Sequence, residues 1–181
     1  DVTVLKELQL LTGNLKIHTE GKSKTDTKNR VVFANSKMAN LNLGTEIGRR
    51  FDLGTKKPSL LTEFKFYIKE NDFESNQFKI NIYSIKNGKP FQLLNQENIY
   101  VSTSKDYIGW VNINLENYNL IIQEDIIVAV QWIKFTGNGN TLNLPVIIPS
   151  LGSTHYYKFG SQNAWEKYGK VSSAMVLTFQ Q

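Results

Sequence analysis

The sequence contains no cysteine, only four prolines and only two histidines, His18 and His155, in 181 residues. The absence of cysteine excludes disulfide bonds, thiolate nucleophiles and cysteine-ligated metals, although it does not indicate a compartment. The longest uninterrupted apolar run covers residues 126–130, far short of the roughly 18 residues that a membrane helix needs. The chain opens without the basic and apolar regions of a signal peptide, as would a mature secreted protein or an excised domain. We therefore expect no membrane span.

The net charge of +5 is placed unevenly along the chain. Residues 1–57 contain 11 Lys and Arg against 6 Asp and Glu, whereas residues 58–181 contain 10 of each kind. This excess of positive charge is typical of a solvated entry segment, and equally of a patch attracted to anionic lipid, polysaccharide or nucleic acid. No recognition helix or RNP-like aromatic motif accompanies it, so we expect no nucleic-acid partner.

Alternation of apolar and polar residues from about residue 30 onward predicts an all-β fold. Residues 64–68, 78–82 and 111–115 each alternate in this way, which predicts strands with one buried face. Residues 126–135 are apolar on both faces, which predicts a strand covered on both sides. About nine strands at this spacing favour a two-sheet antiparallel sandwich of the jelly-roll kind. We expect this domain over residues 30–181, and a linker or the tail of a preceding region over residues 1–29.

Residue patterns that support catalysis are missing from the sequence. His155 follows Ser153 closely, but no G-x-S-x-G elbow is present and the two residues are too near in sequence to be positioned by separate elements. Glu124 and Asp125 are adjacent, so on a strand their carboxylates point to opposite faces and do not form a glycosidase pair. We therefore expect that the chain is not an enzyme.

One loop is rich in oxygen ligands. Glu70, Asp72 and Glu74 lie between two predicted strands, and carboxylates at this spacing suit a calcium ion. The loop lacks the ligand order and the glycine of an EF-hand, and a solvated hairpin loop has the same composition. Neither an H-E-x-x-H motif nor a Cys/His cluster occurs in the sequence, so we expect no zinc site. Calcium at this loop is thus the only cofactor that the sequence indicates.

Two tryptophans are candidate binding residues. Trp110 is in register with Asn112 and Asn114 and opposite to Val111 and Ile113, so we expect an indole on a polar sheet face, where it can stack on a sugar ring. A covered face, beneath the N-terminal segment or another domain, is the alternative. Trp165 lies in a predicted loop, from which it either binds a ligand or plugs one end of the core.

Several segments in one order, residues 44–50, 78–90, 98–101, 115–121 and 160–165, resemble the C-terminal region of bacterial envelope proteins that contain a carboxypeptidase-like regulatory domain. This resemblance covers about residues 30–181. It implies a β-sandwich accessory region rather than a peptidase, located in the periplasm, at the outer-membrane surface or outside the cell, and it transfers no catalytic residue. The segment 156–165 also resembles jelly-roll adhesin and carbohydrate-binding modules, as an analogy of fold.

These observations support two hypotheses about function. The first is a non-catalytic binding or assembly module of a bacterial cell-envelope protein, which docks a protein partner on an exposed edge or on the face with Trp110. The alternative is a carbohydrate-binding module that grips a polysaccharide with Trp110 or Trp165.

Overall fold

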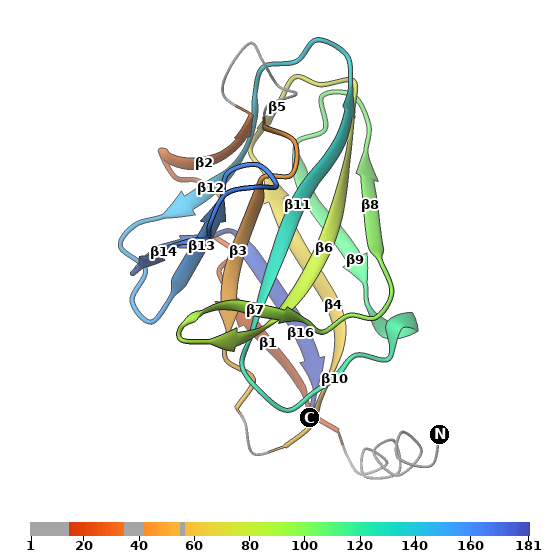
Figure 1. Cartoon of the computed structure of the whole chain (residues 1–181), viewed down its shortest axis with the longest axis vertical. Helices are drawn as coiled ribbons and strands as arrows, with labels where there is room; N and C mark the ends of the chain where they lie inside the picture. Colours follow the sequence, from red (N-terminus) through yellow and green to blue (C-terminus); the bar gives the residue numbers. More distant parts are fainter. Residues whose placement is uncertain (1–14, 35–41, 55–56) are drawn as a thin grey trace.

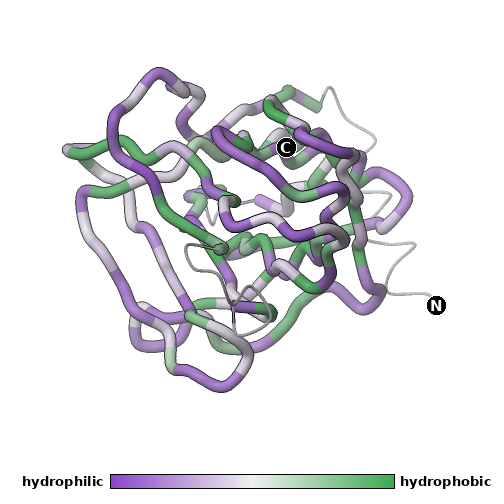
Figure 2. The backbone as a smooth tube through the Cα atoms, turned by 90° about the horizontal axis from the view of Figure 1, so that it is seen from above, coloured by the Kyte–Doolittle hydropathy of each residue, from purple (hydrophilic) through white to green (hydrophobic). Residues whose placement is uncertain are grey.

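The computed structural model describes residues 15–34, 42–54 and 57–181, and it is an all-β protein built from antiparallel sheets (Figure 1). A short 3-10 helix, η2 (Glu116–Tyr118), joins two of the strands. None of the helices in these residues is both long enough and apolar enough to span a membrane. Buried and less buried residues alternate along much of residues 59–68, as the period of two in the sequence predicts. Figure 2 shows hydrophobic and hydrophilic stretches interleaved along the backbone.

The five-stranded sheet forms one layer of the molecule. Its order is β1-β16-β4-β10, with β9 also paired to β4. The strands are β1 (Ile17–Gly21), β4 (Ser59–Ile68), β9 (Gly109–Asn114), β10 (Ile121–Ile122) and β16 (Met175–Gln180). Because β9 pairs only with β4, its other side is an open sheet edge.

The seven-stranded sheet forms the facing layer. Its order is β14-β13-β3-β11-β6-β7, with β8 also paired to β6. The strands are β3 (Glu46–Phe51), β6 (Ser75–Lys86), β7 (Lys89–Leu93), β8 (Ile99–Thr103), β11 (Ile126–Thr136), β13 (Thr154–Lys158) and β14 (Glu166–Gly169). The turn at Asn87-Gly88 joins β6 to β7, with both residues at positive φ, which is the backbone conformation that Asn-Gly hairpins favour.

A smaller four-stranded sheet completes the fold. Its order is β15-β12-β2, with β5 also paired to β12. The strands are β2 (Asn29–Ala34), β5 (Glu70–Asn71), β12 (Leu142–Ile147) and β15 (Ser172–Ser173). Figure 1 shows β2 and β12 at the same side of the molecule as β13 and β14.

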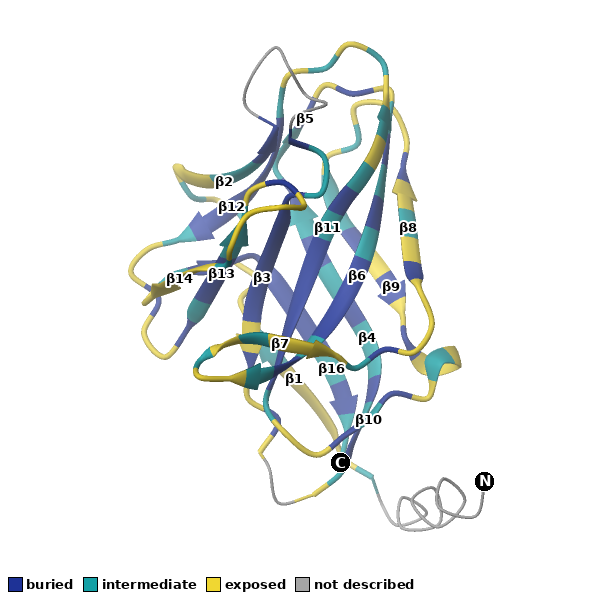
Figure 3. Cartoon of the chain, viewed as in Figure 1, coloured by how far each residue is buried: buried dark blue, intermediate teal, exposed yellow. Residues whose placement is uncertain are grey.

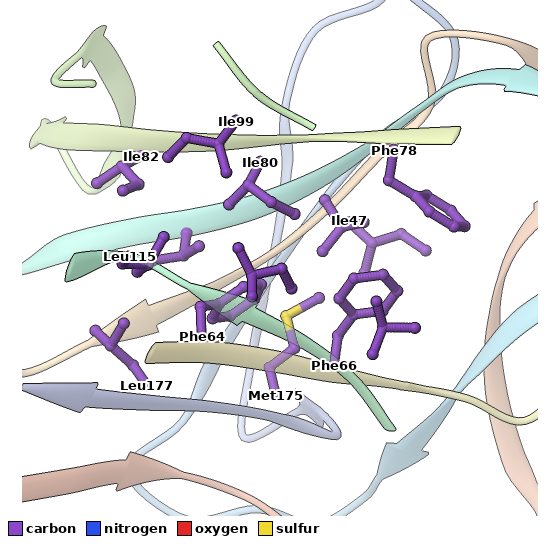
Figure 4. Packing of buried hydrophobic residues seen from close by; sticks show 14 of the residues in the cluster. Ile47, Phe64, Phe66, Phe78, Ile80, Ile82, Ile99, Leu115, Met175 and Leu177 are labelled. Atoms are coloured by element: carbon purple, nitrogen blue, oxygen red, sulfur yellow. The ribbon is translucent and has the colours of Figure 1, made fainter. Parts of the chain in front are cut away.

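The main core lies between the two larger sheets. Figure 4 shows Ile80 and Ile82 of β6 on one side and Phe64, Phe66 and Met175 on the other, with their side chains directed toward one another. Phe66 and Phe78 pack edge to face, with ring centroids 5.3 Å apart at 73°. Such pairs contribute about 0.5–1.5 kcal/mol beyond the area that they bury.

The prediction that residues 126–135 are covered on both sides is confirmed for the first half of β11, since residues 126–130 are all buried (Figure 3). On the outer face, the β6–β7 hairpin supplies cover, because the Tyr156 hydroxyl of β13 donates a hydrogen bond to the carbonyl oxygen of Gly88 at 3.1 Å. Gly48 lies on β3, between β11 and β13, and a Cβ at this position would come within 3.2 Å of the Ala129 side chain. The outer face is therefore packed rather than solvated at this point.

Three expectations need correction. The described residues form sixteen strands in three sheets, not about nine in two, because β5, β10 and β15 are two-residue pairings with no sequence period to reveal them. Residues 17–21, expected within a linker, form β1 and pair along their whole length with β16. Ile17 to Thr19 are exposed, so β1 is held by backbone hydrogen bonds at an edge rather than by an apolar face. Residues 1–14 lie outside the described residues.

Candidate functional site

The open edges of the two larger sheets face each other across a groove of about 420 Å³. We call it the Trp110 groove. One wall comes from the end of β8 and the loop after it, and the other from β9. Its lining residues are Val101, Ser102, Thr103, Ser104, Tyr107, Trp110, Val111 and Asn112.

The predicted register of β9 is confirmed. Val111 and Ile113 are buried, whereas Asn112 and Asn114 are exposed and Trp110 is half-buried. The Trp110 indole is edge-on to the ring of Tyr67 on β4, with centroids 5.4 Å apart, and the Lys65 ammonium is 5.2 Å from the indole centroid. These two neighbours fix the orientation of the indole at the sheet edge and leave part of it accessible.

Tyr107 occupies the open edge of β9. Its hydroxyl donates a hydrogen bond of 2.6 Å to the carbonyl oxygen of Trp110, and the Asn112 amide makes a longer contact of 3.5 Å with the same oxygen. This carbonyl therefore already has a partner, although it lies at an edge with no neighbouring strand. Tyr107 and Trp110 both line the groove.

Polar groups in the groove are not all satisfied within the chain. The hydroxyl of Thr103 is buried and has no hydrogen-bond partner among the described residues. Asn112 and Ser102 are exposed side chains in the same lining, and each offers a donor and an acceptor. Asn114, predicted as part of the same polar row, lies beyond the groove lining, and its side-chain oxygen accepts the backbone N–H of Glu116 at 2.8 Å.

Trp165 does not join Trp110. Its ring is edge-on to Tyr83 on the outer face of the seven-stranded sheet, with centroids 5.8 Å apart, and the Lys158 ammonium lies 5.2 Å from its centroid. The loop that carries it is held to the start of β3, because the Gly160 N–H donates to the Thr45 hydroxyl at 3.0 Å. The two tryptophans predicted as alternative binding residues thus lie at different places on the fold.

The sheet face beneath Trp165 carries a buried carboxylate that the sequence did not reveal. Glu46 is 1% exposed and accepts hydrogen bonds from the Tyr83 hydroxyl at 2.9 Å and the Asn81 amide at 3.1 Å. Its other oxygen forms an ion pair with the ammonium of Lys158. Burial, followed by the charge of Glu46, raises the pKa of Tyr83. This network is structural, since it fastens β3, β6 and β13 together.

The predicted calcium ligands are not brought together. Glu70 accepts hydrogen bonds from Asn143 and Arg30, and these partners hold its pKa below the ordinary value. Asp72 caps a different loop, accepting the backbone N–H groups of Asn140 at 2.8 Å and Thr141 at 2.7 Å, while Glu74 is exposed. No three acidic or histidine side chains in the described part of the chain form a metal-binding group. The arrangement does not support calcium at this loop.

His155 is buried in an apolar setting. It is 3% exposed, its Nδ1 has no hydrogen-bond partner among the described residues, and burial lowers its pKa to about 4. A catalytic imidazole is normally oriented by a carboxylate, and none is bonded to this one. Ser153 instead shares a hydrogen bond of 2.9 Å with Ser150. The Ser153 hydroxyl is thus bonded to Ser150 and not to the imidazole of His155.

Sequence reasoning missed the residues that complete the Trp110 groove. Tyr107 and Thr103 follow no pattern of their own, because Tyr107 lies in a loop and Thr103 at the end of a short strand. The one available signal was the position of Tyr107 three residues before Trp110. Asp106 has a positive φ of 51°, and the Tyr107 hydroxyl that follows reaches the backbone carbonyl of Trp110.

Comparison with known proteins gives a likeness of fold. No family model and no curated protein matches the chain. A solved structure of the cysteine protease and lectin-like domains of Cwp84, a surface-layer-associated protein of Clostridium difficile, matches with a TM-score of 0.54 and 12% identity over 86% of this chain. A second structure, clostridial cysteine protease Cwp84 after propeptide cleavage, matches with a TM-score of 0.55 and 16% identity over 93%. This chain spans only 36% and 40% of those two chains.

Proposed function

We propose that this chain is a non-catalytic binding module of a bacterial cell-envelope or secreted protein, and that its ligand is a carbohydrate held in the Trp110 groove. The observation that carries the proposal is one groove that combines a half-buried indole with the exposed hydroxyl of Ser102 and the exposed amide of Asn112. A sugar ring presents an apolar face and several hydroxyl groups, and it therefore matches both features.

The volume and polarity of the groove favour this ligand class. About 420 Å³ lies in the range of small-molecule sites. Tyr107 and Trp110 supply aromatic surface, while Ser102, Ser104 and Asn112 supply exposed donors and acceptors around it. The groove lining contains no Asp, Glu or His, so it offers binding groups without a general acid or base.

A protein partner that adds a strand to the open edge of β9 is the second candidate. Strand addition is favoured by the two unpaired edges, of β8 and β9, at the groove. At Trp110 it is opposed by the Tyr107 hydroxyl, which already occupies the carbonyl that an added strand would use. We therefore place carbohydrate first.

The cellular location is part of the proposal. It is supported by the resemblance of residues 30–181 to envelope proteins, and by the fold likeness to chains from a surface-layer-associated protein and its lectin-like domain. A jelly-roll arrangement of the two larger sheets is likewise proposed, because many carbohydrate-binding and lectin domains have it.

The test is affinity electrophoresis against a panel of neutral and acidic bacterial polysaccharides, followed by titration calorimetry with oligosaccharides of any that retard the protein. We expect Trp110→Ala to weaken binding about tenfold or more, as truncation of an aromatic anchor does. Its thermal unfolding should stay close to that of the parent, since Trp110 is only half-buried.

Tyr100→Ala is the matched control. Tyr100 is 51% exposed on β8, beside the groove but outside its lining, so its loss should leave binding unchanged. Retardation that survives Trp110→Ala, or that disappears equally in Tyr100→Ala, would contradict the proposal. Binding of a peptide rather than a polysaccharide at this groove would favour the second candidate.

A further inference from the structure

One cation lies directly at the aromatic surface of the Trp110 groove. Lys65 is on β4, and it pairs in register with Asn112 of β9, a residue of the groove lining. Figure 1 shows these two paired strands side by side. The Lys65 ammonium is 5.2 Å from the centroid of the Trp110 indole, and the side chain is half-buried. A positive charge therefore lies beside the surface to which we assign the sugar ring.

The ammonium of Lys65 has no carboxylate partner in the described part of the chain. None of the ion pairs and side-chain hydrogen bonds formed by these residues includes its nitrogen. Its one interaction there is with the Trp110 ring, whose electron-rich face attracts the cation without using its N–H donors. Such an ammonium can bind an anion without first giving up a partner in the protein.

Acidic side chains near Lys65 do not neutralise it. Glu63 is on the same face of β4, but it pairs with Asn114, which lies outside the groove lining. In the loop that forms part of one wall, Lys105 and Asp106 are adjacent and exposed, so their opposite charges leave no net charge there. Because the lining itself contains no Asp or Glu, this side of the groove is positively charged.

A hexuronate matches this combination of a charge and an aromatic surface. Its pyranose ring has an apolar face that can stack on an indole, and its carboxylate is bonded directly to that ring. The carboxylate is thus held at the rim of a ring stacked on Trp110, within reach of the flexible Lys65 side chain. In a polymer joined by phosphodiesters the charge is on a flexible linkage, so stacking on the indole does not place it at the ammonium.

We propose that the sugar bound in the Trp110 groove is acidic, a hexuronate unit of an anionic polysaccharide. Its ring stacks on Trp110, and its carboxylate accepts a hydrogen bond from the ammonium of Lys65. The exposed Ser102 hydroxyl and Asn112 amide bind the ring hydroxyl groups. This inference rests on the proposed carbohydrate function, to which it adds the charge of the ligand and the residue that selects it. Acidic and neutral rings gain the same stacking, so the selectivity comes from the ion pair.

Titration calorimetry with matched ligands tests the role of the charge. The ligands are trisaccharides of galacturonate, glucuronate and mannuronate, each as the free acid and as the methyl ester, which removes the charge and keeps the ring. For the trisaccharide that binds best, we expect the acid to bind about three- to tenfold more tightly than the ester at low salt, as a partly exposed ion pair allows. Higher salt should weaken binding of the acid alone. Poly(glycerol phosphate) provides the comparison with a phosphate polymer.

Variants of the protein test whether Lys65 is the source of the preference. Lys65→Gln should lower the affinity for the acid to that for the ester and leave the affinity for the ester unchanged, whereas Lys65→Arg should retain the preference. Lys79→Gln is the matched control, because Lys79 is also half-buried but lies on β6 opposite Tyr100, outside the groove lining. It removes the same charge from the molecule without altering the groove. Thermal unfolding of the three variants checks that the sheets are intact.

The possible outcomes separate this inference from the proposed function. If esters or neutral polysaccharides bind as tightly as the acids, and Trp110→Ala abolishes that binding, the carbohydrate function stands and the acidic ligand is overturned. A preference for the acid that Lys65→Gln and Lys79→Gln reduce equally also overturns it, as does tighter binding of poly(glycerol phosphate) than of any hexuronate. If no saccharide of either kind binds, the proposed function itself fails, and this inference fails with it.

Discussion

The guanidinium of Arg49 on β3 contacts the carboxylate of Glu20 on β1 at 3.2 Å, and this ion pair joins the two larger sheets. Arg49 is the buried partner and Glu20 the partly exposed one. The Arg49 side chain is 3% exposed and that of Glu20 is 30% exposed. The second carboxylate oxygen of Glu20 accepts the backbone N–H of Asp52 at 3.1 Å. Glu20 therefore anchors an edge strand whose own side chains are otherwise largely in water.

Replacement of Glu20 by glutamine should lower the free energy of unfolding by about 2–3 kcal/mol, since it leaves the buried guanidinium of Arg49 without its counter-charge. Urea denaturation measures the change. The comparison is Arg30→Gln, which breaks the exposed pair with Glu70 and should lower stability by less than about 1 kcal/mol. Equal effects of the two substitutions would show that burial of Arg49 does not decide the outcome.

Strands with one buried face were predictable from the sequence, and those without such a face were not. Phe64, Phe66 and Ile68 of β4 are all buried, as their alternation with polar residues predicts. Residues 17–21 have no comparable pattern, because β1 is an edge strand held by backbone pairing and by Glu20. Its membership of the sheet depends on contacts with distant residues, and a local pattern contains no record of them.

The same limit applies to the candidate sites. The exposed face of β9 was predictable from the buried positions of Val111 and Ile113. Its pairing with Tyr107 and Thr103 depends on how the edges of two sheets meet. The interpretation of Glu70, Asp72 and Glu74 as one site was wrong in geometry, because β5 ends at Asn71 and the carboxylates of Glu70 and Asp72 accept hydrogen bonds from separate partners.

The free energy of unfolding should decrease as the pH is lowered, because His155 is buried as a neutral imidazole. Burial lowers its pKa from an ordinary 6.5 to about 4, so below pH 6.5 the unfolded chain binds a proton that the folded chain does not. The contribution of the neutral imidazole is complete above about pH 6.5 and is lost as the pH falls toward 4, a loss of about 3 kcal/mol in all. Its titratable neighbours are Tyr157 and Tyr168, whose pKa values are raised, and Arg49 in the facing register position.

Urea unfolding between about pH 7 and pH 5 measures this dependence, and His155→Gln should flatten it. The pKa values of Asp125 and Glu70 are lowered in the folded chain, so their stabilisation is also lost in acid, but only as the pH falls below the ordinary carboxylate pKa of about 4. A slope that is the same in His155→Gln and in the parent would assign the pH dependence to other groups.

Asn71 should control the Trp110 groove without touching it. Its side-chain oxygen accepts from the Phe73 N–H at 3.1 Å and from Asn76 at 3.0 Å, and its amide donates to the carbonyl oxygen of Tyr107 at 3.4 Å. Asn71→Asp keeps the two accepted bonds and replaces the donor to Tyr107 by an oxygen. We expect faster hydrogen exchange at the amides of residues 106 and 107, and weaker ligand binding in the groove by several fold.

Asn76→Asp is the matched change for this experiment. It keeps the side-chain oxygen that accepts the Trp132 indole N–H at 3.0 Å, and it breaks the bond to Asn71 without altering the one to Tyr107. Both variants should lose stability by about 1–3 kcal/mol, and only Asn71→Asp should change exchange at residues 106 and 107. Identical exchange in the two would mean that the loop is held by its other bond, from the Asp106 N–H to the Phe73 carbonyl.

Replacing Lys158 alone should lower the free energy of unfolding more than replacing Lys158 and Glu46 together. Lys158→Met leaves the carboxylate of Glu46, 1% exposed, without a cation, which should lower the free energy of unfolding by about 3–5 kcal/mol. Adding Glu46→Gln removes that buried charge, while the new amide oxygen still accepts from Tyr83 and Asn81, so the double variant should recover much of the loss. Chemical denaturation of the two single variants and the double variant gives the coupling energy. If the double variant is less stable than Lys158→Met, the buried carboxylate of Glu46 is stabilised by its hydrogen bonds from Tyr83 and Asn81 rather than by the charge of Lys158.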